Sequence, residues 1–243
     1  MSYYNKTMGF KLNNTKWIAH RGYSSQEVEN TLPAFLLACK EKGFDGIECD
    51  IQTTKDQKFV VFHDRDLKRM CSVEILVKDL TLSELQEYPM YNKNGELDYS
   101  YHIPSLEEYI EICKKYKKTC FVEIKSYMRK KQLSLVLDTI EKLNYLDNCV
   151  FISFHITCLM TMRLLKRNIK LQYICDYKLK KLNFLCKRFR IGIDYKYSII
   201  KNNEIQSFKK LGLLTNSWTV NDKNTAKNLI AYDIDYITSN YLF

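Results

Sequence analysis

The sequence has little of the material that builds linkers, membrane anchors or secretion signals. Of its 243 residues only 7 are glycine and 3 are proline, and these form no linker-like cluster. No run of about 18 apolar residues is present to span a membrane, and residues 1–16 contain no apolar core of a signal peptide. Internal repeats and low-complexity segments are also missing. These absences favour one domain that covers residues 1–243.

The nine cysteines lack the spacings that would give them a metal-binding or cross-linking role. Their number is odd, they are scattered, and none forms a C-x-x-C pair, so neither a zinc site nor a disulfide framework is indicated. Disulfides are rare in reducing compartments. We therefore expect reduced, mostly buried thiols and a cytoplasmic protein.

What the sequence does have is positive charge, with 38 Lys and Arg against 28 Asp and Glu and a net charge of +10. Such a surface favours anionic partners, including phosphates, nucleic acid and acidic lipid headgroups, without choosing among them. The basic stretch 178–190 could dock peripherally on an anionic membrane. A helix with a solvated basic face explains this stretch as well, and no nucleic-acid partner is expected.

Apolar runs alternate regularly with amphipathic ones along the chain. Strands are expected at 17–20, 45–52, 120–125, 150–154, 171–175, 191–195, 214–220 and 235–238. Helices are expected near 31–43, 81–87, 105–115, 133–143, 158–167, 179–189, 203–211 and 224–232. Eight strands with a helix after nearly every one predict an α/β fold, the closed (β/α)₈ TIM barrel.

One apolar run breaks this alternation. Residues 59–63 follow the second strand after only the short segment 53–58, whereas a parallel crossover needs about a dozen residues. We therefore expect a hairpin that turns near Asp56-Gln57 and returns His63 to the end of the second strand. Residues 64–102 then form a small insertion after this strand.

Three carboxylates are expected at the mouth of the barrel. Glu48 and Asp50 share one face of the second strand, because residues i and i+2 point the same way, and Glu123 occupies a similar place on the third. Oxygen ligands alone favour a hard cation, Mg²⁺, Ca²⁺ or Mn²⁺, over Zn²⁺. The alternative, exposed surface carboxylates, fits poorly with strands that should be buried on both sides.

The same strand ends carry groups suited to phosphate chemistry. His20 and His63 form a plausible acid and base pair, since imidazole can take either role near neutral pH. Arg21 and Lys125 are natural phosphate ligands, although both could instead pair with the carboxylates. Trp218 ends the seventh strand and is either an apolar wall for a substrate or part of the core. His102 and His155 are weaker candidates, each more readily explained as structural.

Six motifs in this order resemble the glycerophosphodiester phosphodiesterase family. They are His20-Arg21-Gly22, Glu29-Asn30-Thr31, Glu48-x-Asp50, the hairpin that ends in His63-Asp64, Glu123-Ile124-Lys125 and Trp218-Thr219-Val220-Asn221. Each is weak alone, but the ordered set is specific and spans nearly the whole chain. The resemblance implies a TIM barrel with a segment inserted after the second strand.

The resemblance also implies roles for individual residues. It makes His20 and His63 the catalytic acid and base, without saying which is which. It makes Glu48, Asp50 and Glu123 the ligands of a divalent cation, and Arg21 and Lys125 the phosphate ligands. Three departures bear on substrate preference: Asp56-Gln57 replaces Asp-Gly in the hairpin turn, His155 follows the fourth strand where an acid or amide is usual, and Ser239-Asn240 replaces Thr-Asp.

The expected activity is therefore metal-dependent hydrolysis of a glycerophosphodiester to glycerol 3-phosphate and an alcohol. The attacking group could be water or the substrate's own neighbouring hydroxyl. Two alternatives stay open at this point. One is a lysophospholipase D that acts on lysophospholipids, and the other is a barrel that binds a phosphate ligand without turning it over.

Overall fold

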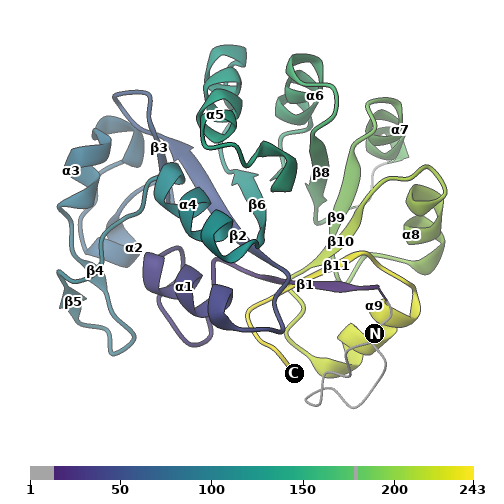
Figure 1. The fold of residues 1–243 in the computed structure, drawn as a ribbon, viewed down its shortest axis with the longest axis horizontal. Coiled ribbons are helices and arrows are strands. Elements are labelled where there is room, and N and C mark those ends of the chain that lie inside the picture. The colour runs from purple at the N-terminus through teal and green to yellow at the C-terminus, as the bar shows by residue number, and fades with distance from the viewer. Residues whose placement is uncertain (1–13, 178–179) are drawn as a thin grey trace.

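The chain folds into a closed barrel of parallel strands surrounded by helices (Figure 1). The computed structural model describes residues 14–177 and 180–243, and within them eight strands form the barrel. These strands are β1 (Lys16–Ala19), β2 (Gly46–Thr53), β6 (Thr119–Ile124), β7 (Cys149–Ser153), β8 (Lys170–Cys175), β9 (Gly192–Lys196), β10 (Thr215–Trp218) and β11 (Tyr236–Ser239). They pair in the order β1-β11-β10-β9-β8-β7-β6-β2, and β2 also pairs with β1 to close the ring. The predicted (β/α)₈ TIM barrel is confirmed.

Helices follow the strands and cover the outside of the barrel. They are α1 (Leu32–Lys40), α4 (Leu106–Tyr116), α5 (Lys130–Lys142), α6 (Ile156–Leu165), α7 (Lys180–Arg188), α8 (Asn202–Lys209) and α9 (Lys223–Ala231), with the short helix η2 (Leu146–Asn148) before β7. The predicted elements lie within a few residues of these bounds. Of the basic stretch 178–190, residues 178–179 lie outside the described part of the chain.

Local sequence signals set the starts of two helices. Thr31 caps α1 by accepting a hydrogen bond from the Ala34 N–H at 3.4 Å, and Pro33 occupies the first turn, where no N–H is needed. Ser105 and Glu108 form a capping box at the start of α4. Among the described residues, no helix is both long and apolar enough to cross a membrane.

Alternation along the strands sorts side chains into two apolar layers. Ile47, Cys49 and Ile51 of β2 point outward and pack among the buried side chains of the helices, as the spacing predicts. A smaller cluster that includes Ile18, Phe121, Val150, Ile152, Ile174 and Tyr236 fills the barrel interior. All nine cysteines are free and buried, in agreement with the expected thiols.

A hairpin and an insertion follow β2. Strand β3 (Phe59–Val61) runs antiparallel to the end of β2 and pairs Val61 with Ile51, which confirms the predicted hairpin. Gln57 occupies the turn with φ of 60°, a left-handed conformation in which glycine is usual. This explains how the turn forms without the Asp-Gly pair.

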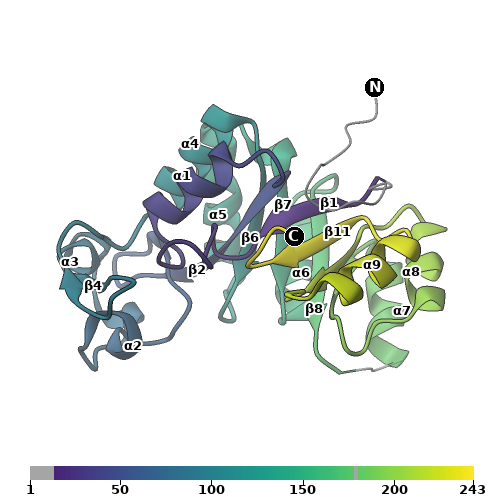
Figure 2. The same cartoon turned by 90° about the horizontal axis from the view of Figure 1, so that it is seen from below.

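The insertion projects to one side of the barrel (Figures 1 and 2). It contains α2 (Lys68–Cys71), η1 (Val77–Asp79), α3 (Leu82–Gln86), β4 (Met90–Tyr91) and β5 (Leu97–Asp98) around its own apolar cluster. Only α3 was predicted, over 81–87. The other elements are too short for a hydrophobic period to show in the sequence.

Candidate active site

The turn after β1 places the first functional side chains. Arg21 and Gly22 both have positive φ, 55° and 79°, so the chain reverses directly after His20. A Cβ atom on Gly22 would come within 2.8 Å of Ala34 in α1, which leaves room for glycine alone. The reversal directs the Arg21 N–H to Glu48 Oε2 at 2.8 Å, and the strands β1 and β2 are thereby joined at the mouth.

Glu48, Asp50 and Glu123 meet inside the barrel mouth. One oxygen of each lies within 4.8 Å of those of the other two, and all three residues are buried. Burial and the charge of Asp50 raise the pKa of Glu48 well above its usual range and that of Glu123 to about 7. Within the described residues, Glu48 Oε1 has no hydrogen-bond partner. Three buried carboxyl groups whose oxygens converge fit a hard divalent cation.

Two cationic side chains flank these carboxylates. Arg21 Nε lies 3.2 Å from Asp50 Oδ2, and Lys125 Nζ lies 2.9 Å from Glu123 Oε1 and 3.5 Å from Asp50 Oδ1. Burial alone would raise the pKa of Asp50, but the two cations hold it below its usual range. Arg21 and Lys125 thus form ion pairs with the carboxylates and also face the cavity, and phosphate binding by the same side chains stays a prediction.

The two histidines have different hydrogen-bond partners. His20 Nδ1 donates to the amide oxygen of Asn240 at 2.8 Å, and His63 Nδ1 lies 2.7 Å from the carboxylate of Asp64. Among the described residues, neither ring forms a hydrogen bond through its Nε2 atom. Burial and the nearby Arg21 lower the pKa of His20 to about 4, so this ring is neutral at physiological pH.

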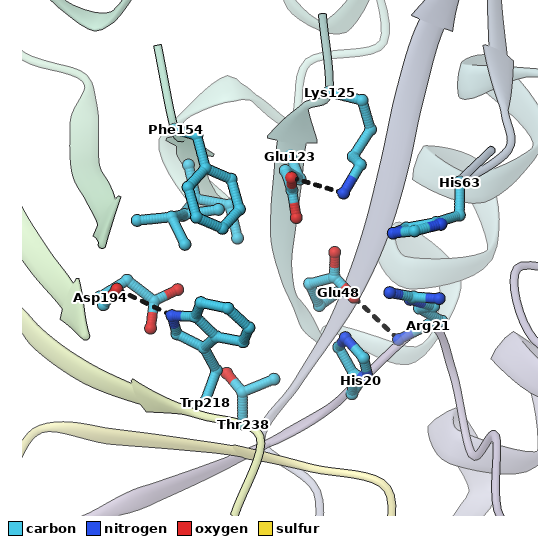
Figure 3. Close-up of a pocket in the computed structure, with 12 residues that line it drawn as sticks. His20, Arg21, Glu48, His63, Glu123, Lys125, Phe154, Asp194, Trp218 and Thr238 are labelled. Carbon is cyan, nitrogen blue, oxygen red and sulfur yellow. Dashed lines mark hydrogen bonds and ion pairs between the residues drawn. The ribbon is translucent and has the colours of Figure 1, made fainter. Parts of the chain in front are cut away.

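One cavity of about 210 Å³ collects these groups (Figure 3). His20, Arg21, Glu48, His63, Glu123 and Lys125 line one side of it, from β1, β2, β6 and the end of the hairpin. The opposite side is formed by Ile152, Phe154, Ile174, Asp194, Trp218 and Thr238, from β7 to β11. Asp50 lies behind Arg21 and Lys125, which both contact it. The structure therefore brings every residue predicted for the site to this cavity or next to it.

The weaker histidine candidates do not line this cavity. His102 pairs with Glu108 at 3.2 Å beside the start of α4. His155 directly precedes α6, and its ring packs edge-on against Tyr127 with a centroid distance of 6.5 Å. Both are explained by structural contacts, as the sequence favoured.

Several residues that support the site had no role assigned from the sequence. Asn30 Nδ2 donates to Asp50 Oδ2 at 2.8 Å, and Asn30 itself has a positive φ of 56°. Arg69, in α2 of the insertion, contacts Glu29 at 2.7 Å and Asp64 at 2.6 Å. Glu29 in turn pairs with Arg21, and Asp64 with His63. Through these two carboxylates, Arg69 links Arg21 and His63 to the insertion.

Phe154 and Asp194, on the side of the cavity away from the histidines, were also missed. Asp194 carried a detectable signal, since it is the only acid in the otherwise apolar or uncharged run 191–195. The same signal identified Glu48 and Glu123. Phe154 follows a strand that is apolar except for Ser153, so nothing in the sequence distinguishes Phe154 from a core residue.

Comparison with known proteins adds an independent observation. The sequence profile of the glycerophosphoryl diester phosphodiesterase family matches residues 20–242. The chain belongs to this family. Its members include the glycerophosphodiester phosphodiesterase of Caldanaerobacter subterraneus, which is 30% identical over 223 residues, 90% of this chain and 91% of that protein. YhdW of Bacillus subtilis is 32% identical over 232 residues, 92% of this chain and 93% of YhdW.

Solved structures agree with this assignment. The crystal structure of a glycerophosphodiester phosphodiesterase from Parabacteroides distasonis superposes with a TM-score of 0.80 at 26% identity, over 94% of this chain and 93% of that one. The family is one of phosphodiester hydrolases, so the protein is an enzyme.

Proposed function

We propose that this family member hydrolyses glycerophosphodiesters to glycerol 3-phosphate and an alcohol in a metal-dependent reaction. The observation that carries the proposal is the shared cavity, in which three buried carboxylates, two cations and two histidines converge. A non-catalytic phosphate-binding barrel would need the cations alone, and it would leave the two oriented histidines without a purpose.

Glu48, Asp50 and Glu123 are suited to hold a divalent cation, because their buried oxygens face one another and repel without one. Bound there, Mg²⁺, Ca²⁺ or Mn²⁺ would supply neutralisation of the negative charge that builds on the phosphate. Arg21 and Lys125 bind the other phosphate oxygens and orient the diester. Arg21 offers a planar fork and Lys125 a point charge.

His20 and His63 divide the proton transfers between them. His20 is neutral, and its Nδ1–H is held by an amide, so its Nε2 can accept the proton of the attacking hydroxyl. The Asp64 carboxylate lies 2.7 Å from His63 Nδ1 and orients the ring, so that its Nε2 can donate a proton to the leaving alkoxide. In this proposal His20 is the base and His63 the acid.

The decisive experiment measures glycerol 3-phosphate release from glycerophosphocholine with Mg²⁺, Ca²⁺ or Mn²⁺. We expect turnover that EDTA abolishes and added metal restores. If no metal supports release from the diester while lysophosphatidylcholine is cleaved, the protein is a lysophospholipase D. If neither compound is cleaved, the proposed hydrolytic activity is wrong.

A further inference from the structure

The proposed reaction leaves one side of the cavity unexplained. This side, formed by the ends of β7, β8, β9 and β10, presents Ile152, Phe154, Ile174 and Trp218 around one carboxyl group, that of Asp194. None of these side chains contributes a proton, a phosphate ligand or a member of the carboxylate cluster. A diester has two alcohols, however, and one of them must occupy space next to the phosphate.

Asp194 is an unusual residue for such a surface. It is 2% exposed, and only one hydrogen-bonding side chain, that of Asn216, interacts with its carboxyl group. Within the described residues its Oδ1 atom has no hydrogen-bond partner, and no cationic side chain pairs with it. It is also not among the carboxylates whose oxygens come within 4.8 Å of one another. A buried carboxyl group without a cationic partner is unfavourable, which points to a partner supplied from outside the chain.

The surroundings of Asp194 specify the chemistry of that partner. Trp218 donates its Nε1–H to the main-chain oxygen of Asp194 at 3.0 Å, which fixes the indole beside the carboxyl group (Figure 3). Phe154 packs against Trp218 edge-to-face, with a centroid distance of 5.6 Å. Aromatic rings attract cations through their π faces, most clearly the quaternary ammonium group. Rings and a carboxyl group together therefore suit an alkylated ammonium ion.

A neutral polyol fits this surface poorly. Besides Asp194, the one polar residue on this side of the cavity is Thr238, and its hydroxyl already exchanges hydrogen bonds with the Asn216 side chain at 2.9 and 3.3 Å. The hydroxyls of a sugar or a second glycerol would meet apolar side chains. Burying them without partners is unfavourable.

The cationic side chains of the cavity and the Asp194 carboxyl group are on different sides of it. Arg21 and Lys125 lie on the side away from Trp218 and Asp194, as Figure 3 shows. A zwitterion with a phosphate at one end and an ammonium group at the other can match both sides at once. Burial and the charge of Glu123 raise the pKa of Asp194 well above its usual range, and an adjacent ammonium group would favour its ionised form.

We propose that Asp194, Trp218 and Phe154 form a subsite for the cationic alcohol of the substrate, of the choline class. This inference rests on the proposed function, and it adds the leaving group that the site prefers. Diesters with a quaternary ammonium alcohol would be cleaved in preference to diesters of neutral alcohols.

The test compares glycerophosphocholine with glycerophosphoglycerol, which differ in the charge of the alcohol. We expect kcat/KM to be at least about tenfold higher for the choline diester in the wild type, and Asp194→Asn to lower this ratio by about tenfold or more. Asp138→Asn, an exposed carboxyl on α5, is the matched control and should leave the ratio unchanged. Equal values in the wild type, or an unchanged ratio in Asp194→Asn, would overturn the subsite.

A second measurement needs no variant. Choline and 3,3-dimethyl-1-butanol have the same shape, but the latter has a neutral carbon in place of the charged nitrogen. Choline should inhibit hydrolysis at an approximately tenfold lower concentration, and equal inhibition would contradict the proposal. If neither diester is hydrolysed, the proposed function fails. The subsite is then tested by thermal unfolding, in which choline alone should raise the midpoint, and no rise would exclude it.

Discussion

The two sides of the barrel mouth are built on the same strand geometry but carry opposite kinds of surface. On β1, β2 and β6, inward positions hold His20, Glu48, Asp50 and Glu123, and neighbouring charges contact one another. On β7 to β10, the inward positions are mostly apolar, and Asp194 is the one acid among them. The comparison shows two ways of burying carboxyl groups. On the charged side they pair with cationic side chains, whereas on the other side a single carboxyl group has no cationic partner within the described residues.

The most severe test of the charged side is Asp50→Asn. Asp50 contacts Arg21, Lys125 and Asn30, so its loss removes a proposed metal ligand and leaves two partly buried cations with fewer partners. We expect activity to fall by about 10⁴-fold or more and stability by about 3–5 kcal/mol. Glycerol 3-phosphate release and urea unfolding measure these effects, with Asp138→Asn as the control. Near-normal activity would show that Asp50 is not a ligand of the metal.

The histidines should give the next largest effect. His20→Ala and His63→Ala are each expected to lower kcat by about 10²- to 10⁴-fold while the fold is retained, as circular dichroism would show. A substrate with a p-nitrophenol leaving group needs little acid assistance. It should therefore largely rescue His63→Ala but not His20→Ala. The reverse pattern would exchange the roles of base and acid, and near-wild-type activity in either variant would contradict the proposed pair.

The burial of Glu123 and the repulsion from Asp50 predict a stability effect that depends on pH. The pKa of Glu123 is raised to about 7 in the fold, so above this pH its ionised form destabilises the folded state. In EDTA at pH 8, Glu123→Gln should be more stable than the wild type, by on the order of 2–3 kcal/mol. This difference should shrink as the pH falls through 7 and nearly vanish near the unfolded pKa of about 4.5. Urea unfolding at several pH values checks it, and a difference that grows at low pH would contradict the mechanism.

A substitution on the apolar side of the mouth should have the smallest effect on activity and stability. Trp218→Phe removes one hydrogen bond, that to the Asp194 main chain, and should reduce stability by about 1 kcal/mol. Because the ring makes no contact with the transferred protons in the proposed mechanism, hydrolysis of glycerophosphoglycerol should fall by less than about tenfold. Thermal unfolding and steady-state kinetics measure the two effects. A loss of activity as large as that of the histidine variants would show that the two sides of the barrel mouth do not differ in function.

The sequence predicted the barrel and the charged side because both follow from short-range rules. Alternation along strands fixes which face Glu48 and Asp50 share, and parallel strands bring their carboxyl ends to one mouth. The short segment 53–58 allowed only a hairpin, and the hairpin delivers His63. Each of these steps needs only neighbouring residues and the period of the element.

Contacts between distant segments could not be predicted in this way. Asn240 meets His20 across a separation of 220 residues, and Arg69 meets Glu29 across 40. No spacing rule selects one asparagine or arginine among many on the surface. That no cationic side chain in the described part of the chain pairs with Asp194 likewise appears only when every neighbouring strand is in place, because it is a property of the assembled barrel.

Through the contacts of Arg69, the insertion should affect the temperature at which activity is lost. Its guanidinium group contacts the two carboxylates that hold Arg21 and His63, yet it lies on a helix of only four residues packed on a small apolar cluster. Short elements with small cores open locally before the whole fold does. Each opening would release both side chains from their partners while the barrel stays intact. On heating, activity should therefore be lost several degrees before the barrel unfolds, and should return on cooling.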